Sequence, residues 1–195
     1  MLYLASRSPR RRQLLEALGY RFQIQDIETP EQRLPDEVPV DYVTRAAHEK
    51  ALAGLALRAD TSDALVLGAD TEVVLDDEVF GKPADVSAAA SMLRRLSGRT
   101  HEVISVVWLV SREREDVAVC RTQVTFAALS DAQIAAYLAC GEAFGKAGAY
   151  GIQGRAGAFV SHLAGSHSGV MGLPMHETGR LLASFGVWPE PGPGP

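Results

Sequence analysis

The sequence predicts an α/β domain built on a mixed sheet. Apolar runs typical of strands alternate with segments of helical periodicity along the chain, and two of the later strands, 103–110 and 117–126, are joined by a short polar segment that indicates a hairpin. With 195 residues, 47% of them hydrophobic and 22% charged, the chain can bury one substantial core. We therefore expect a single domain over residues 1–186, followed by a disordered Pro/Gly-rich tail over 187–195.

The first elements are predicted as strand, tight loop and helix. Residues 2–5 are an apolar run, and Ser8 suits the N-cap of a helix that begins at Pro9, where a missing N–H costs nothing. Gly19 lies where a left-handed residue is expected to end that helix. The next elements follow from alternation, polarity and helical spacing: a strand around 22–24, a polar loop over 26–37, a helix over about 40–57 and a buried strand over 64–69.

The second half of the chain mixes hairpins and helices. Its elements are, in order, a hairpin of 72–75 with 79–80 around Asp76-Asp77, a helix over 87–96, strands over 103–110 and 117–126, a helix from the cap Ser130 to 138, a strand over 159–163, a loop over 165–169, and a last helix opened by Gly172-Leu173-Pro174. A hairpin beside strands that alternate with helices favours a sheet with both parallel and antiparallel pairs.

Composition excludes several classes of protein. The formal net charge of -5 argues against a general binder of nucleic acid polymers, which would usually be basic, although a local arginine cluster or a metal ion could still hold one nucleotide. The two cysteines, Cys120 and Cys140, lack metal-ligand spacing and indicate a reduced, cytoplasmic compartment. The longest stretch without Asp, Glu, Lys or Arg, 156–176, contains three histidines, several glycines and a proline, so no membrane span is expected.

Three arginines, 10 to 12, occupy the first turn of the first predicted helix. The helix dipole disfavours cations at this end, whereas its unpaired N–H groups favour an anion. Arginine also presents a planar fork that matches phosphate oxygens. The segment from Ser6 to Arg12 is therefore suited to holding a phosphate chain, and the alternative is a solvated surface turn.

Asp70 comes directly after the buried run 64–69. Because ligands gather beyond the carboxyl ends of strands in α/β sheets, this carboxylate is a candidate metal ligand or general base; the alternative is a cap of the next turn. The chain has no GxxxxGK[ST], GxGxxG, GxSxG or HExxH motif, and its histidines show no ligand spacing. The carboxylates Glu31 and Asp70, together with phosphate-suited cations, fit metal-assisted hydrolysis of a phosphoanhydride. Those cations are Arg10, Arg11, Lys50 and Lys82.

Six motifs occur in one order and together resemble the Maf family of nucleoside triphosphate pyrophosphatases from residue 2 to about 186. They are Ser6-x-Ser8-Pro9-Arg10-Arg11, Gly68-Ala69-Asp70-Thr71, Gly81-Lys82-Pro83, Leu96-Ser97-Gly98 with His101 and Val103, Lys146-Ala-Gly-Ala-Tyr-Gly-Ile-Gln-Gly154, and Gly172-Leu173-Pro174. The resemblance implies an elongated mixed sheet flanked by helices, with a cleft between two lobes, similar to the inosine triphosphate pyrophosphatases (Ham1-like). It also implies hydrolysis of a small-molecule nucleoside triphosphate to the monophosphate and pyrophosphate by a homodimer. The implied cofactor is a divalent cation, Mg²⁺ or Mn²⁺, with Co²⁺ as a further candidate.

Site residues follow from the same resemblance. Asp70 matches the catalytic acidic residue, and Glu31 matches a second acidic residue and metal ligand, with Glu28 as the alternative alignment. The other matches divide into the cationic and polar lining of the phosphate site, namely Ser6, Arg11, Lys50 and Lys82, and the positions tied to base selection, namely Arg10, Thr71 and Gln153. Lys50 and Lys82 are expected to act in catalysis with Asp70.

The base-selecting residues, with Glu31-Gln32-Arg33, resemble the subgroup that acts on dTTP and UTP. An amide such as Gln153 can both donate to and accept from the imide edge of uracil or thymine, and such a pocket would tolerate 5-methyl-UTP or pseudo-UTP. Two alternatives remain at this point. One is a nucleotide-binding regulator of septum formation, linked to cell-division arrest. The other is a purine-selective pyrophosphatase of the ITP or 7-methyl-GTP type.

Overall fold

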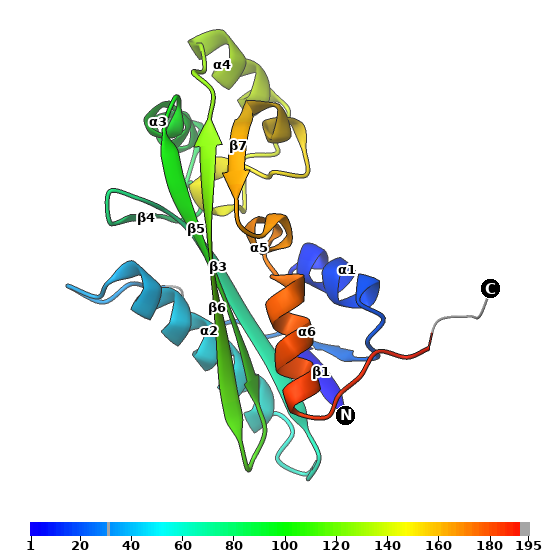
Figure 1. Cartoon of the computed structure of the whole chain (residues 1–195). Helices are drawn as coiled ribbons and strands as arrows, with labels where there is room; N and C mark the ends of the chain where they lie inside the picture. Colours follow the sequence, from blue (N-terminus) through cyan, green and yellow to red (C-terminus); the bar gives the residue numbers. More distant parts are fainter. Residues whose placement is uncertain (31, 192–195) are drawn as a thin grey trace.

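A single mixed sheet runs through the computed structural model, which describes residues 1–30 and 32–191. Its strands follow the order β2-β1-β3-β5-β6-β7, and β4 pairs with β3 off this path (Figure 1). The strands are β1 (Leu2–Ala5), β2 (Gln23–Gln25), β3 (Leu65–Leu75), β4 (Glu78–Phe80), β5 (Thr100–Val110), β6 (Glu115–Phe126) and β7 (Val160–Ala164). The pairs β1–β2 and β1–β3 are parallel, and the others are antiparallel, which confirms the predicted mixed sheet.

Helices flank this sheet, most of them close to where they were predicted. They are α1 (Pro9–Ala17), α2 (Pro39–Ala56), α3 (Val86–Leu96), α4 (Asp131–Ala139), α5 (His167–Met171) and α6 (Met175–Ser184), with short 3₁₀ turns η1 (Ala147–Ala149) and η2 (Arg155–Phe159). Ser8 and Ser130 cap α1 and α4 as expected, through bonds from the Arg11 and Gln133 N–H groups. The predicted loop over 165–169 is wrong in part, because Ser166 accepts a bond from the Gly169 N–H and α5 begins at His167.

The strand that carries Asp70 is longer than its apolar run. We expected it to end at Asp70, but β3 continues to Leu75, and Asp70 pairs with Val106 in the middle of the sheet. On the other edge of β3, the parallel partner β1 ends with Ala5 opposite Gly68, and the antiparallel partner β4 reaches only as far as Phe80, opposite Val73. Within the described residues, this leaves the edge of β3 without a strand partner at 69–72. The prediction of a ligand site beyond a strand end therefore applies to β1 rather than to β3.

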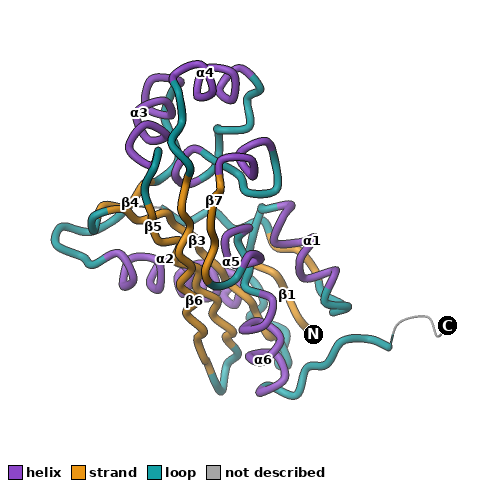
Figure 2. The backbone as a smooth tube through the Cα atoms, turned by 45° about the horizontal axis from the view of Figure 1, so that its top comes forward, coloured by secondary structure: helices purple, strands orange, loops and turns teal. Residues whose placement is uncertain are grey.

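Two large apolar clusters lie toward the two ends of the long central strands. One includes Phe80, Leu93 and Phe126, beside α3 and α4, and the other includes Leu15 and Leu182, beside α1 and α6. Figure 2 shows α3 and α4 together at one end of the molecule, whereas α1, β1 and α6 lie away from that end. A third cluster packs α2 against the sheet. The molecule thus consists of two lobes joined by β3, β5 and β6.

Residues 187 and 190, beyond the last helix, pack on the lobe formed by α1 and α6. Val187 contacts its apolar cluster, and the Glu190 N–H donates to the Gly19 carbonyl at 2.9 Å. Residues 192–195 lie outside the described part of the chain, and disorder over 187–195 stays a prediction. In residues 1–30 and 32–191, none of the helices has the length and apolar character needed to cross a membrane. Cys120 and Cys140 are both free thiols.

Candidate functional site

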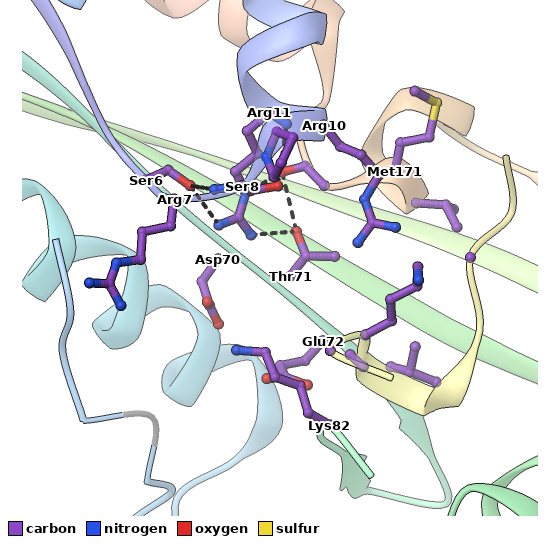
Figure 3. A pocket seen from close by; sticks show the side chains of 18 of the residues that line it. Ser6, Arg7, Ser8, Arg10, Arg11, Asp70, Thr71, Glu72, Lys82 and Met171 are labelled. Carbon is purple, nitrogen blue, oxygen red and sulfur yellow. Dashed lines mark hydrogen bonds between the residues drawn. The ribbon is translucent and has the colours of Figure 1, made fainter. Parts of the chain in front are cut away.

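A cavity of about 900 Å³ lies between the two lobes. Its walls come from the β1–α1 loop, α2, the middle of β3 and the glycine-rich segment before η2 (Figure 3). The predicted site residues that the structure describes all line this cavity: Ser6, Arg10, Arg11, Lys50, Asp70, Thr71, Lys82 and Gln153. Glu31 lies outside the described residues. Glu28 lines the cavity, where its side chain pairs with Arg7 at 3.2 Å and is largely exposed.

The β1–α1 loop fixes one wall of the cavity through hydroxyl groups. The Ser6 hydroxyl accepts a hydrogen bond from the Ser8 N–H at 3.1 Å, and the Ser8 hydroxyl accepts one from the Arg11 N–H at 3.4 Å. The Arg11 guanidinium donates to the Gly172 carbonyl at 2.8 Å and to the Thr71 hydroxyl at 3.4 Å (Figure 3). These bonds hold the Arg11 guanidinium in place at the cavity wall. The alternative, in which this segment is a solvated surface turn, does not describe Arg11.

Lys50 and Asp70 form a buried ion pair beside this wall. Lys50 Nζ is 2.6 Å from Asp70 Oδ1, and the two side chains are 8% and 6% exposed. Asp70 Oδ2 is also buried, and it has no hydrogen-bond partner among the described residues. Burying two charges costs more than an apolar pair of the same size, and an orphaned carboxylate oxygen adds to that cost. Such an arrangement indicates a ligand or reaction role rather than a contribution to stability.

Close packing of α2 on β3 places the two partners of this pair. A methyl group on Gly68 would lie 2.5 Å from the Ala47 carbonyl oxygen and 2.6 Å from the Ala51 nitrogen. A methyl group on Gly54 would lie 2.8 Å from Val66 Cγ1. Two glycines therefore let the helix that carries Lys50 approach the strand that carries Asp70.

Glu72 is a buried cavity residue that sequence reasoning missed. It is 7% exposed and lines the cavity two residues after Asp70, so strand alternation directs the two carboxylates to the same face of β3. We assigned this residue to a hairpin strand and gave it no chemical role. The spacing Asp70-x-Glu72 within one strand was the signal that could have identified it.

The opposite wall carries Gln153 on a glycine-rich segment held by buried tyrosines. The Gly151 N–H donates to the Tyr137 hydroxyl at 3.3 Å, and Tyr150 Oη is 2.8 Å from His101 Nε2. Burial raises the pKa of Tyr137 to about 12, raises that of Tyr150 as well, and lowers the pKa of His101 to about 4. These groups are therefore neutral near pH 7, and they anchor the segment without adding charge to the cavity.

Lys146, on the same segment, is a second cavity residue without an assigned role in the sequence analysis. Its Nζ donates to the Glu142 carbonyl. Burial and the nearby Arg10 guanidinium lower the pKa of Lys146. Sequence spacing cannot reveal this neighbour, because Arg10 and Lys146 come from different lobes.

The carboxylates that line the cavity suit a hard divalent cation that takes most of its ligand atoms from a bound phosphate compound and from water. No group of three or more His, Cys, Asp or Glu side chains is placed to hold a metal within residues 1–30 and 32–191. Mg²⁺, however, is often bound by one or two carboxylates together with phosphate oxygens and water. Asp70 Oδ2, which has no hydrogen-bond partner in residues 1–30 and 32–191, fits that arrangement.

A family profile and curated relatives match nearly the whole of this chain. A family profile described as "Maf-like protein" matches residues 1–185. A "dTTP/UTP pyrophosphatase" of Xanthomonas euvesicatoria pv. vesicatoria is 60% identical over 96% of this chain and all of that protein. A "Nucleoside triphosphate pyrophosphatase" of Xylella fastidiosa strain M23 is 58% identical over 95% of this chain and 98% of its own length. Among solved structures, the Ham1 protein of Staphylococcus aureus matches with a TM-score of 0.43 and 11% identity, over 65% of this chain and 71% of that one.

Proposed function

The chain belongs to the Maf-like protein family, and we propose that it hydrolyses nucleoside triphosphates, with dTTP and UTP favoured, to the monophosphate and pyrophosphate. Relatives about 60% identical to it are named for this activity. Modified pyrimidine nucleotides such as 5-methyl-UTP and pseudo-UTP belong to the same substrate class. A nucleotide-binding regulator of septum formation is not favoured, because the relatives carry the names of enzymes. A purine-selective enzyme is not favoured either, because dTTP and UTP are the nucleotides in the names of those relatives.

One observation carries this proposal: the buried Lys50–Asp70 pair, whose Asp70 Oδ2 has no hydrogen-bond partner in the described part of the chain, opens into a cavity bordered by Arg11 and Lys82. A carboxylate among fixed cations suits attack of water on a phosphoanhydride, because charge develops there on oxygen atoms. Lys50 supplies the positive partner that a buried carboxylate needs. We assign Arg11, Lys50 and Lys82 to the phosphate chain, where they would neutralise the leaving pyrophosphate.

We propose two alternative roles for Asp70 Oδ2. It would take the proton of the attacking water as a general base, or hold a divalent cation together with the phosphate oxygens. When bound, the cation would polarise those oxygens and orient the attacking water. Mg²⁺ and Mn²⁺ are the proposed cations and Co²⁺ a further one, and Glu31 is the proposed second ligand. Measuring the rate of hydrolysis against metal concentration distinguishes the two roles. If Asp70 is a metal ligand, Asp70→Asn raises the metal concentration needed for the half-maximal rate. If Asp70 is only a general base, that concentration does not change.

Pyrophosphate release by the purified protein tests the proposed function. We expect release from dTTP and UTP, with Mg²⁺ or Mn²⁺, to exceed release from CTP, GTP, ITP and 7-methyl-GTP. Asp70→Asn keeps the shape of the side chain and removes its charge, so we expect turnover to fall by roughly 10² or more. Asp60→Asn is the matched control, because Asp60 is an exposed carboxylate beyond the end of α2.

Two outcomes would contradict parts of this proposal. Near-normal turnover of Asp70→Asn would remove Asp70 from the chemistry. Nucleotide binding without pyrophosphate release from any nucleotide would favour the regulatory alternative.

We also propose that the enzyme works as a homodimer in the cytoplasm. The family resemblance supports the dimer, and the two free thiols suit a reducing compartment. Light scattering coupled to size exclusion tests the dimer, since a monomer mass at all protein concentrations would contradict it. Fractionation of cells tests the location, and recovery of the protein in the membrane or periplasmic fraction would contradict a cytoplasmic enzyme.

A further inference from the structure

The cavity has two ends that differ in their charged partners. Figure 3 shows Arg11 directed toward Thr71 and the side of Asp70, whereas Arg10 extends past Thr71 toward Met171. At the Asp70 end, the cation Lys50 is matched by a carboxylate at 2.6 Å. Arg10 and Arg11 are adjacent in sequence, but their side chains therefore extend toward opposite ends of the same cavity.

Lys146 meets Arg10 at the second end, over the backbone of Gly151. A methyl group on Gly151 would lie 2.9 Å from Lys146 Cε and 3.5 Å from Arg10 Nη1. Both side chains therefore approach the same point from different lobes, one from α1 and the other from the segment just before η1. Gly151 leaves room for both of them.

The nearest opposite charge, the Glu142 carboxylate, offsets these two cations only in part, because burial and Arg10 lower the pKa of Lys146 more than Glu142 raises it. Lys146 Nζ donates to the Glu142 backbone carbonyl, which is a neutral acceptor, and the Glu142 carboxylate accepts the Arg155 N–H at 2.8 Å instead. In residues 1–30 and 32–191, no carboxylate forms an ion pair with Arg10 or Lys146. Two like charges held together in a partly buried cavity oppose folding. The arrangement is suited to a ligand that presents acceptor atoms.

We propose that Lys146 contacts the substrate and determines its specificity, recognising with Arg10 the carbonyl oxygens of uracil and thymine. This inference rests on the proposed function and deepens it. An ammonium group has three donors, of which the Glu142 carbonyl uses one, and a guanidinium has donors only. Gln153, on the same wall, can both donate and accept, so it complements the two cations at an imide edge.

This chemistry selects against cytosine. Uracil and thymine carry acceptor oxygens at positions 2 and 4, whereas cytosine carries an amino donor at position 4. A donor facing another donor leaves both unpaired in a partly buried site. The recognition pair Arg10–Lys146 would therefore favour UTP and dTTP over CTP and dCTP.

The first experiment measures kcat and KM for dTTP and dCTP in three variants. Lys146→Met keeps the aliphatic chain over Gly151 and removes the ammonium, Lys146→Arg keeps the charge, and Arg155→Met removes an exposed cation just beyond Gln153 that does not line the cavity. We expect Lys146→Met to lower the ratio of kcat/KM for dTTP to kcat/KM for dCTP about 10-fold or more, mainly because KM for dTTP rises. Lys146→Arg should keep most of this ratio, and Arg155→Met should keep all of it.

Two kinetic results would overturn the inference. An unchanged ratio in Lys146→Met would show that the ammonium does not recognise the base. Equal losses for dTTP and dCTP would instead place Lys146 at the phosphate chain.

Binding separates this inference from the proposed function. The α,β-imido analogues of dUTP and dCTP resist cleavage between the α- and β-phosphates, so their Kd values do not depend on turnover. A wild-type preference for the dUTP analogue that disappears in Lys146→Met supports the inference even if no nucleotide is hydrolysed, in which case only the proposed function fails. Equal affinity of the wild type for both analogues, or a preference that survives in Lys146→Met, overturns the inference.

Discussion

At the scale of single residues, His101 shows how the buried interior constrains ionisation. Its Nε2 atom is 2.8 Å from Tyr150 Oη, and its ring packs edge-on against Phe126. Burial lowers the pKa of His101 from 6.5 to about 4. The unfolded chain therefore binds a proton between about pH 6.5 and pH 4 that the folded chain does not bind.

We expect the free energy of unfolding to fall as the pH drops from about 6.5 toward 4, because protonation of His101 then favours the unfolded state. The contribution of this one residue is on the order of 3 kcal/mol and levels off below its folded pKa. Urea unfolding across this pH range should show a weaker pH dependence in His101→Gln than in wild type. His162→Gln, on an exposed face of β7, should match wild type. Equal slopes for wild type and His101→Gln would contradict the prediction.

Residue types and motifs pointed to eight residues that the structure places on the cavity wall, including Asp70, Lys50 and Gln153. Glu72 was missed because charged residues are uncommon within a buried strand, so the apolar run ending before Asp70 and the hairpin strand starting at Glu72 were predicted as separate elements. Lys146 could not be assigned, because its significance depends on the approach of Arg10 from the other lobe. Sequence reasoning therefore pointed to cavity residues that belong to local motifs, and it missed Glu72, which lies inside an unrecognised strand, and Lys146, whose neighbour comes from long-range contact.

At the scale of secondary structure elements, the contact between α2 and β3 sets the geometry of the Lys50–Asp70 pair. We expect Gly68→Ala to lower the free energy of unfolding by about 2 kcal/mol or more, because the added methyl overlaps the backbone of α2 at Ala47 and Ala51. Turnover should fall as well, since moving α2 away from β3 lengthens the 2.6 Å contact. Thermal unfolding and pyrophosphate release check the two effects.

Gly179→Ala is the matched control for this substitution. Gly179 lies in α6, and outside this helix the described atom that a methyl group there would approach is Tyr20 Oη, at 4.0 Å. Because alanine favours a helix more than glycine does, we expect up to about 1 kcal/mol of added stability and unchanged turnover. Gly68→Ala with wild-type stability would show that α2 can shift without cost.

Element types were largely predictable, whereas the course of β3 was not. The sequence pattern indicated its apolar first half, and the hairpin around Asp76-Asp77 indicated its end, but their union in one strand was not recognised. The gap left at 69–72 between β1 and β4 depends on where two neighbouring strands stop. Such a gap is a property of the assembled sheet.

At the scale of the whole molecule, the cavity depends on both lobes at once. Arg10 and Arg11 come from the lobe of α1, Lys146 and Gln153 come from the lobe of α3 and α4, and β3 passes between them. Neither lobe alone contains the residues assigned to the phosphate chain and to the base.

The parallel pairing of β1 with β3 has a consequence for the order of folding. Leu2 pairs with Leu65 only after a loop of about 60 residues closes, whereas Val110 and Glu115 pair across a short hairpin turn. Chains longer than about 150 residues often fold through intermediates. The hairpin of β5 and β6 should therefore form before the first strand docks and brings Arg10 and Arg11 to the cavity.

Refolding from urea would reveal this order. With Trp188→Phe, Trp108 is the sole tryptophan, and it pairs with Val117 across the hairpin of β5 and β6, so its fluorescence reports the formation of that hairpin. We expect this signal to recover faster than hydrolysis of dTTP, because the phosphate site waits for the slowest long-range pairing. Simultaneous recovery would mean that the sheet assembles in one cooperative step. A lag would identify a chain that is already compact but unable to hold a nucleotide, which is the species most exposed to aggregation during synthesis.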